Sequence, residues 1–293
     1  MASSAFQKST IVRLIRGLYG ACEVVAPGLG AKLAARMWFT LPQPPRTPPP
    51  PEGGEPFEVE SLRAKVRGRY WGDGPVVYLM HGWGGLGAQL APYVDPLVRR
   101  GYRVVMFDAP AHGASDPGPS GPRSSHGVEF GKALDAVAAR FGPAHAVIAH
   151  SMGAVPVLLT LKYGWLSTER LVFLAPMSRF STQFDAFARL LGLGPRIRRR
   201  VEAITEQRVG IPVAGFDLLP LAEETGPIPT LMVHDRGDRQ TSYLESAALA
   251  AALPAAELVS TDGLGHRRLL RDRSVVESVV AFVVDGDAAE AVA

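Results

Sequence analysis

The sequence predicts an α/β fold with a mostly parallel central sheet flanked by helices, a small helical cap and an N-terminal helical extension. From residue 57 onward, short runs of β-branched residues alternate with longer amphipathic stretches, which is typical of βα units around a parallel sheet. The composition, 47% hydrophobic and 20% charged, is that of a globular chain. A chain of 293 residues can bury a large core without disulfides, and Cys22 is its only cysteine.

Three regions follow each other along the chain. Residues 1–40 are expected to form an amphipathic helical extension, because apolar residues recur at three-to-four spacing from position 8 to 40. Pro27 and Gly28 should divide it into two helices. Residues 41–56 contain eight prolines and should form an extended linker. The main domain is expected over residues 57–293.

The main domain is expected to begin with antiparallel strands within residues 57–71 and to continue with alternating strands and helices. Strands are predicted at 76–80, 103–108, 146–149, 171–175, 230–234 and 257–260. Helices are predicted at 90–100, 128–141, 152–163, 243–253 and 268–284. An insertion at about 177–227 carries two amphipathic stretches, 180–191 and 196–208, and is too long for an ordinary loop. It predicts a helical cap over one end of the sheet.

Charge and hydropathy limit the kinds of binding partner and the cellular compartment that can be expected for this protein. Lysine and arginine number 31 against 28 acidic residues, and the resulting charge of +3 is too small to predict nucleic-acid binding. Charged residues interrupt the N-terminal apolar stretch, so neither a membrane span nor a secretory signal peptide is expected. The cytoplasm is therefore the default prediction. Residues 8–40 either pack against the body of the protein or make peripheral membrane contact through their basic, apolar surface.

The first chemical signal is a serine that follows a buried strand. Ser151 comes directly after the strand around 146–149 and before a helix, with Ala149 and Gly153 two positions to either side. Small neighbours allow a sharp strand-to-helix turn that exposes a nucleophilic hydroxyl. The turn also aims the helix N-terminus and the Met152 amide at the place where negative charge develops.

A serine hydroxyl needs a base to remove its proton, and that base needs an orienting carboxylate. Among seven histidines, His266 is the best candidate, since it lies in a glycine-bearing loop between the last strand and the last helix. Asp238 is the preferred carboxylate because it lies beyond the strand at 230–234, where a loop can bring it to the imidazole. Asp235, at the end of that strand, is the alternative.

The segment His-Gly-Trp-Gly-Gly at 81–85 is expected to supply the second oxyanion donor, the Trp83 amide. The glycine spacing at 82–87, with Asp108 ending the next strand, also fits a dinucleotide-binding loop. That alternative leaves Ser151, Asp238 and His266 unexplained, and the prolines at 92 and 96 interrupt the helix it requires.

Other histidines are given structural roles. His81 is expected to hydrogen-bond backbone and shape its loop, and His112 is expected to lie on the polar surface. His150 is either a neighbour of the substrate pocket or a packed core residue. His126, His145 and His234 carry no stronger claim to a catalytic role.

Taken in order, five motifs give the chain from about 57 to 284 a clear resemblance to α/β-hydrolases of the serine esterase and lipase type. The motifs are HGWGG at 81–85, DAPAHGAS at 108–115, AHSMG at 149–153, HDRGD at 234–238 and GH at 265–266. The resemblance implies an α/β-hydrolase fold and a catalytic triad of Ser151, Asp238 and His266. It also implies an oxyanion hole at the Trp83 and Met152 amides. The sequence departs from the family pattern at Ala149, usually glycine, and at Asp235, often glycine.

The expected function is cleavage of carboxylic esters, or related acyl compounds, through an acyl-enzyme on Ser151. The substrate should be a small-molecule acyl ester, and no metal, organic cofactor or nucleic acid is expected. Two alternatives stay open: an acyltransferase that uses the same triad, and a non-catalytic ligand-binding protein on the same fold.

Overall fold

The computed structural model describes residues 2–44, 46–47 and 49–285, and of residues 2–10 only the course of the backbone. Positions 45 and 48 of the expected linker and residues 286–293 of the expected main domain lie outside the described residues. The chain forms two compact units. Unit 1 combines the N-terminal residues up to Thr40 with Arg179–Asp217, and unit 2 combines Leu41–Ser178 with the residues from 218 onward.

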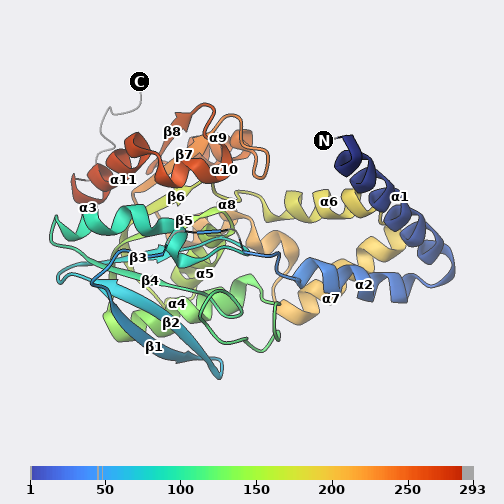
Figure 1. Cartoon of the computed structure of the whole chain (residues 1–293), viewed down its shortest axis with the longest axis horizontal. Helices are drawn as coiled ribbons and strands as arrows, with labels where there is room; N and C mark the ends of the chain where they lie inside the picture. The colour runs from blue at the N-terminus through green and yellow to red at the C-terminus, as the bar shows by residue number, and fades with distance from the viewer. Residues whose placement is uncertain (1, 45, 48, 286–293) are drawn as a thin grey trace. The chain divides into compact units, whose positions relative to one another are not determined.

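Unit 2 is built on a single eight-stranded sheet whose order is β1-β2-β4-β3-β5-β6-β7-β8 (Figure 1). Strand β2 pairs antiparallel with β1 and with β4, and the remaining neighbours pair in parallel. The strands are β1 (Glu55–Ser61), β2 (Ala64–Trp71), β3 (Val76–Met80), β4 (Arg103–Phe107), β5 (Ala144–His150), β6 (Thr168–Leu174), β7 (Thr230–Asp235) and β8 (Ala256–Thr261). The predicted antiparallel opening and the six predicted parallel strands are therefore confirmed.

Alternate side chains of the parallel strands face opposite layers of helix. One set, such as Val77, Leu79, Ile148 and Val233, forms a core with the segment after β3 and with α11 (Arg273–Asp285). In Figure 1, α4 (Gly127–Phe141) and α5 (Ala154–Lys162) lie on the side of the sheet away from α3 (Val94–Val98) and α11. Helices thus cover both faces, which buries the sheet and leaves its edges and strand ends for chemistry.

The helix predicted at 90–100 is different in the structure. A 3-10 helix, η1 (Gly87–Tyr93), runs into the short α3. Pro92 and Pro96 cannot donate backbone hydrogen bonds, so one regular helix cannot form there. The other helical elements of unit 2 are η2 (Ser151–Gly153), α8 (Leu218–Thr225), α9 (Tyr243–Ala252), α10 (Gly265–Arg268) and η4 (Leu269–Arg271).

Unit 1 is entirely helical and has its own core. It contains α1 (Ala2–Val25), α2 (Pro27–Phe39), α6 (Phe180–Leu191), α7 (Pro195–Val209) and η3 (Val213–Phe216). The break at Pro27 and the two helices of the insertion are where the sequence predicts them. The ring of Trp38 packs within 5.0–5.5 Å of the rings of Phe180, Phe184 and Phe187, measured between centroids. The N-terminal helices and the insertion helices therefore share one apolar core.

Helix α1 also exposes an apolar stripe. Ile11, Leu14, Leu18 and Val25 recur at helical spacing and are more than half exposed. Among the described residues, no helix is long and apolar enough to cross a membrane. Peripheral membrane contact through residues 8–40 stays a prediction, as does the covering of the sheet end by the insertion at 177–227.

Candidate active site

Ser151 lies at a strained turn between β5 and η2. Its φ of 55° is in the left-handed region, which costs a non-glycine residue about 1–3 kcal/mol and is typical of functional turns. A Cβ placed on Gly153 would lie 2.6 Å from the carbonyl oxygen of His81. A Cβ placed on Gly82 would lie 2.9 Å from the Cβ of Ser151. Close approach of these backbones therefore requires glycine at both positions and brings the loop at 81–85 beside the serine.

His266 contacts this serine although it lies 115 residues later in the sequence. It lies in α10, just beyond β8, and its Nε2 is 3.1 Å from Ser151 Oγ. Its Nδ1 is 2.7 Å from Oδ2 of Asp238, a residue in the loop that follows β7. With the Nδ1 proton donated to the carboxylate, Nε2 of the neutral ring is free to accept the serine hydroxyl proton. The three predicted residues are thus joined by hydrogen bonds in the order Ser151, His266, Asp238.

The carboxylate of Asp238 is buried but well supplied with donors. Oδ1 accepts the backbone N–H groups of Gln240 at 2.7 Å and Thr241 at 3.2 Å. Burial alone would raise the pKa of Asp238, but hydrogen bonds from His234 and His266 outweigh it and lower the pKa below its ordinary value. Asp238 is therefore ionised at neutral pH and can stabilise a positive charge on His266.

Two neighbours of Asp238 were not predicted from the sequence. His234, fully buried at the end of β7, places Nε2 at 3.3 Å from Oδ2 of Asp238. The hydroxyl of Thr241 donates to the same oxygen at 3.0 Å. The only sequence signal for His234 is its position four residues before Asp238 at the end of a buried strand.

A chain of buried hydroxyls continues behind His234. Its Nδ1 is 2.8 Å from the hydroxyl of Ser246, which is 2.8 Å from the hydroxyl of Ser178. If Nε2–H of His234 is donated to the carboxylate, Nδ1 accepts from Ser246 and Ser246 accepts from Ser178. This arrangement satisfies every member of the chain and fixes the orientation of the His234 ring.

Asp235, the alternative carboxylate, does not contact His266. Its side chain accepts hydrogen bonds from the Thr261 hydroxyl at 2.9 Å and from the backbone N–H of Leu264 at 2.8 Å. It also accepts the N–H of Gly237 at 2.9 Å. Asp235 therefore ties the end of β7 to the loop that carries His266, which is a structural task.

The loop at 81–85 is held by two buried histidines. Nδ1 of His81 lies 2.8 Å from the Gly82 carbonyl, and Nε2 accepts the N–H of Ala109 at 2.9 Å, which confirms the predicted role in shaping the loop. His112 accepts the N–H of Gly84 at 3.1 Å. The prediction that His112 lies on the surface is wrong: it is only 4% exposed, because the loop at 108–115 folds back under the glycine loop.

The two predicted oxyanion donors come from the glycine loop at 81–85 and from η2. Among the hydrogen bonds of the described residues, none uses the backbone N–H of Trp83. The N–H of Met152 is in the first turn after the serine, where helical N–H groups have no partner within the helix. Both amides belong to segments that contact Ser151, so their placement is compatible with the predicted role.

His150 is a packed residue. It is 4% exposed, and its Nε2 donates to the backbone carbonyl of His266 at 3.0 Å. Burial, followed by repulsion from the neighbouring His266 ring when that ring is protonated, lowers the pKa of His150 to about 3. His150 is therefore neutral and holds the loop of His266 against the turn that carries Ser151.

The competing dinucleotide site has no support in the geometry. Asp108, which would bind a ribose, uses both carboxylate oxygens to accept the N–H groups of Gly87 at 2.8 Å and Ala114 at 3.0 Å. Over the part of the chain that the structure describes, no cluster of histidine, cysteine and carboxylate side chains could hold a metal ion.

Comparison with known proteins gives a consistent picture. A model of the alpha/beta hydrolase family matches residues 76–278, and no curated protein matches the chain in sequence. Among solved structures, the chain is similar to Est1E of Butyrivibrio proteoclasticus bound to ferulic acid, with a TM-score of 0.60, 17% identity, and coverage of 78% of this chain and 97% of that one.

Two further structures are similar to the chain. The Pyrococcus furiosus esterase PF2001 has a TM-score of 0.64 and 19% identity, with coverage of 84% of this chain and 96% of that one. The thioesterase domain from the curacin biosynthetic pathway has a TM-score of 0.57 and 17% identity, with coverage of 80% and 100%. At these identities the similarity shows the fold.

Proposed function

Because this chain belongs to the alpha/beta hydrolase family, we propose that it is a serine hydrolase that cleaves carboxylic esters or related acyl compounds through an acyl-enzyme on Ser151. The observation that supports this most directly is the continuous set of hydrogen bonds from Ser151 through His266 to Asp238. A nucleophile, a base and an ionised carboxylate joined in this order carry out acyl transfer in enzymes of several unrelated folds.

In the acylation step, Ser151 Oγ attacks the carbonyl carbon while Nε2 of His266 takes the hydroxyl proton. Asp238 stabilises the resulting imidazolium, and the amides of Trp83 and Met152 hold the oxyanion. The bond to the leaving group then breaks, and the leaving group takes the proton from His266. Water attacks the acyl-enzyme by the same steps, which releases the carboxylic acid and restores the serine.

The test is turnover of p-nitrophenyl esters of increasing acyl length by the wild-type chain and by Ser151→Ala. We expect the substitution to lower kcat by about a millionfold, because the members of such a triad act as a unit. As a matched control, Ser115→Ala removes a buried hydroxyl that bonds the backbone of the Asp108 loop and should retain turnover. Ordinary turnover in Ser151→Ala would overturn the proposal.

A further inference from the structure

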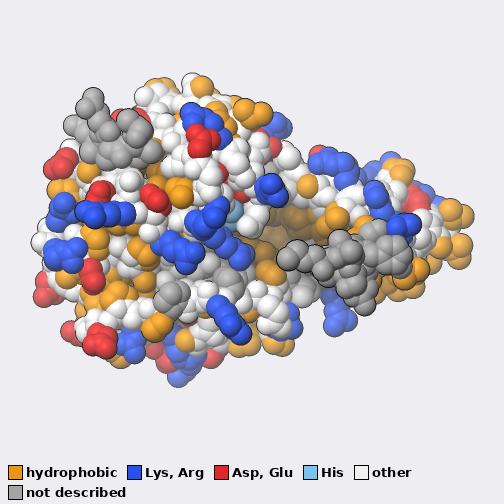
Figure 2. Space-filling model, turned by 45° about the horizontal axis from the view of Figure 1, so that its top comes forward, with side chains coloured by type: hydrophobic (Ala, Val, Ile, Leu, Met, Phe, Trp, Pro, Cys, Tyr) orange, Lys and Arg blue, Asp and Glu red, His pale blue; other side chains and the backbone are white. Residues whose placement is uncertain are grey.

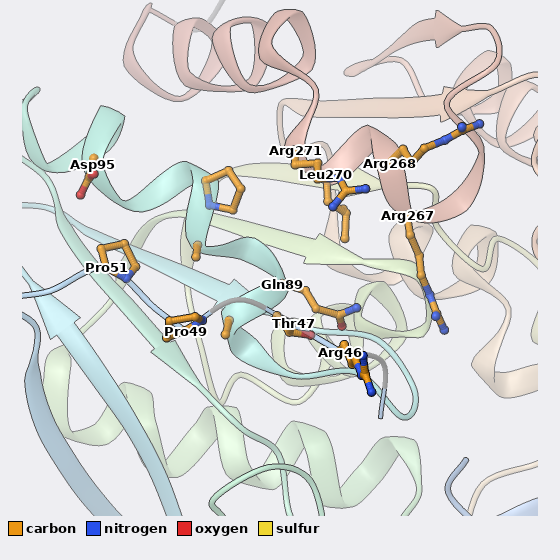
Figure 3. Close-up of a pocket in the computed structure, with 13 residues that line it drawn as sticks. Arg46, Thr47, Pro49, Pro51, Gln89, Asp95, Arg267, Arg268, Leu270 and Arg271 are labelled. Atoms are coloured by element: carbon orange, nitrogen blue, oxygen red, sulfur yellow. The ribbon is translucent and has the colours of Figure 1, made fainter. Parts of the chain in front are cut away.

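A cavity of about 510 Å³ lies in unit 2, next to η1, the helix that follows the glycine loop at 81–85. Its walls come from η1 and the start of α3, from α10 and η4, and from the linker (Figure 3). The volume is in the range of small-molecule sites. Four of its lining side chains are arginines: Arg46, Arg267, Arg268 and Arg271. We call it the arginine pocket.

The positive charge of the arginine pocket is not balanced by carboxylates. Among the ion pairs of the described residues, none includes any of the four arginines. Asp95 is the only acidic residue in the lining, and in Figure 3 it lies at the end of the pocket opposite Arg46 and Arg267. Arg268 is turned onto the backbone carbonyls of Gly263 and Leu264. Arg46, Arg267 and Arg271 therefore have guanidinium groups available for an anion.

The identity of these cations favours phosphate. All of the lining cations are arginines, whose planar guanidinium groups bind phosphate and carboxylate through paired hydrogen bonds. One carboxylate needs only one such partner. A phosphate monoester carries about 1.5–2 negative charges near neutral pH and three acceptor oxygens, and can use several. Figure 2 shows several Lys and Arg side chains close together on the face of the molecule that it views.

Two segments of the candidate active site continue directly into the walls of the pocket, although neither Ser151, His266 nor Asp238 lines it. Arg267 directly follows His266, and η1 begins four residues after Trp83. His266 must hand its proton to the leaving group, so a group that departs toward Arg267 would meet the cations of the pocket.

We propose that the arginine pocket binds the phosphorylated part of the substrate's leaving group, so that the substrate is an acyl ester or thioester of a phosphate-bearing alcohol or thiol. This inference rests on the proposed function. In the acylation step the carbonyl carbon gains a bond to Ser151 Oγ and loses its bond to the leaving oxygen or sulfur. The leaving group takes the proton held by His266 and stays bound through its phosphate until water has been admitted.

The experiment compares two thioesters of the same acyl group, one of coenzyme A and one of N-acetylcysteamine. Both have similar reacting thioesters, and only the first carries phosphates. The test variant is Arg267→Gln with Arg271→Gln, and the matched control is Arg99→Gln with Arg100→Gln, two exposed arginines at the end of α3 that do not line the pocket.

We expect the pocket variant to lose about tenfold or more in kcat/KM for the coenzyme A thioester, as expected for the loss of charge-assisted hydrogen bonds. Its kcat/KM for the N-acetylcysteamine thioester should change less than about twofold, and the control variant should resemble the wild type on both. Equal losses on both substrates, or no preference of the wild type for the phosphorylated one, would overturn the proposal.

A second measurement separates this proposal from the proposed function. Inorganic diphosphate is titrated into Ser151→Ala, alone and combined with the two pocket substitutions, and binding is followed by calorimetry. Saturable binding that the pocket substitutions abolish supports the pocket even if no ester is turned over, in which case only the proposed function fails. Diphosphate binding without any preference between the thioesters would show a free-anion site and overturn the leaving-group role. Normal turnover without diphosphate binding would overturn the pocket.

Discussion

At the scale of single residues, the environment of Asp238 explains how a buried carboxylate stays charged. Oδ2 is approached by Nδ1 of His266, by Nε2 of His234 and by the hydroxyl of Thr241. Each donor favours the ionised form, and together they outweigh the cost of burial. The orientation of His266 therefore depends on residues that never contact the serine.

We expect His234→Ala to lower kcat/KM by about tenfold, because one charge-assisted hydrogen bond to a buried carboxylate is lost. Without His234, Asp238 accepts more strongly from His266, which favours the protonated imidazole. The acid limb of the pH profile of kcat/KM should therefore move to higher pH.

The readout for this prediction is the pH profile, with His234→Gln and His145→Ala as comparisons. His234→Gln keeps an N–H donor and should recover part of the loss. His145 pairs with the exposed Glu169 instead, so its substitution should leave the profile in place. An unchanged profile in His234→Ala would show that His234 only fills space.

Local motifs in the sequence were enough to select Ser151 and His266 as candidate site residues. They were not enough to predict features that depend on contacts between distant segments. Ser151 and His266 are marked by the small residues and glycines beside them. Asp238 is distinguished from Asp235 only by its distance past the strand. The burial of His112 depends on the 108–115 loop folding under the glycine loop, a contact between segments that local patterns do not encode.

At the scale of elements, the approach of β5 and η2 to the glycine loop explains why the turn at Ser151 has small neighbours. Gly153 has an ordinary helical φ of −60°, so glycine is not needed there for its backbone conformation. It is needed because a larger side chain would clash with the backbone at His81. We expect Gly153→Ala to lower the free energy of unfolding by about 1–3 kcal/mol through overpacking against the backbone at His81. Denaturant titration measures this.

The matched substitution is Gly20→Ala in α1, where an added Cβ meets nothing within 4 Å. There the same change should stabilise by up to about 1 kcal/mol, since alanine favours helix over glycine. Equal effects at the two positions would contradict the steric account.

A second contact joins elements that are distant in sequence. The carboxylate of Glu23 in α1 accepts the first N–H groups of α7, those of Arg196 at 2.8 Å and Ile197 at 3.0 Å. It acts as an N-cap supplied by another helix. We expect Glu23→Ala to destabilise unit 1 by about 1 kcal/mol, measured by hydrogen exchange of α7, whereas Glu257→Ala in β8 should leave α7 unchanged. Equal α7 exchange in the wild type and in Glu23→Ala would refute the cap.

Sequence periodicity predicted both of these helices but not their pairing. Apolar spacing defines a helix and its buried face, whereas the partner of that face depends on how the whole chain folds. The interrupted helix at 87–98 shows the opposite case, because Pro92 and Pro96 are local signals that favour the break the structure contains.

At the scale of the whole molecule, buried neutral histidines make stability depend on pH. Burial, as the largest cause, lowers the pKa of His112 and of His150 to about 3, whereas an unfolded chain has histidines with a pKa of about 6.5. Below about pH 6.5 the unfolded state therefore binds more protons than the folded state, and stability falls as the pH falls.

We expect the free energy of unfolding to be lower by at least about 3 kcal/mol at about pH 5.5 than at about pH 7.5, with His112 and His150 each contributing about 1.4 kcal/mol. Burial also lowers the pKa of His81, which adds to the loss. The lowered pKa of Asp238 also makes stability fall with pH, but only below the ordinary pKa range of aspartate, so it does not add to the loss in this window. Denaturant titrations at the two pH values measure the difference, and His112→Gln should reduce it by about 1.4 kcal/mol. A stability that is flat over this range would contradict the assignment of neutral histidines.

The most direct test of the central claim, that Ser151 is an activated nucleophile, is labelling of the intact chain with a fluorophosphonate probe followed by peptide mass spectrometry. The account predicts one label, on Ser151, and none in Ser151→Ala, because the hydroxyl reacts only when His266 takes its proton. A chain that turns over esters yet carries no label, or carries it on another residue, would contradict it.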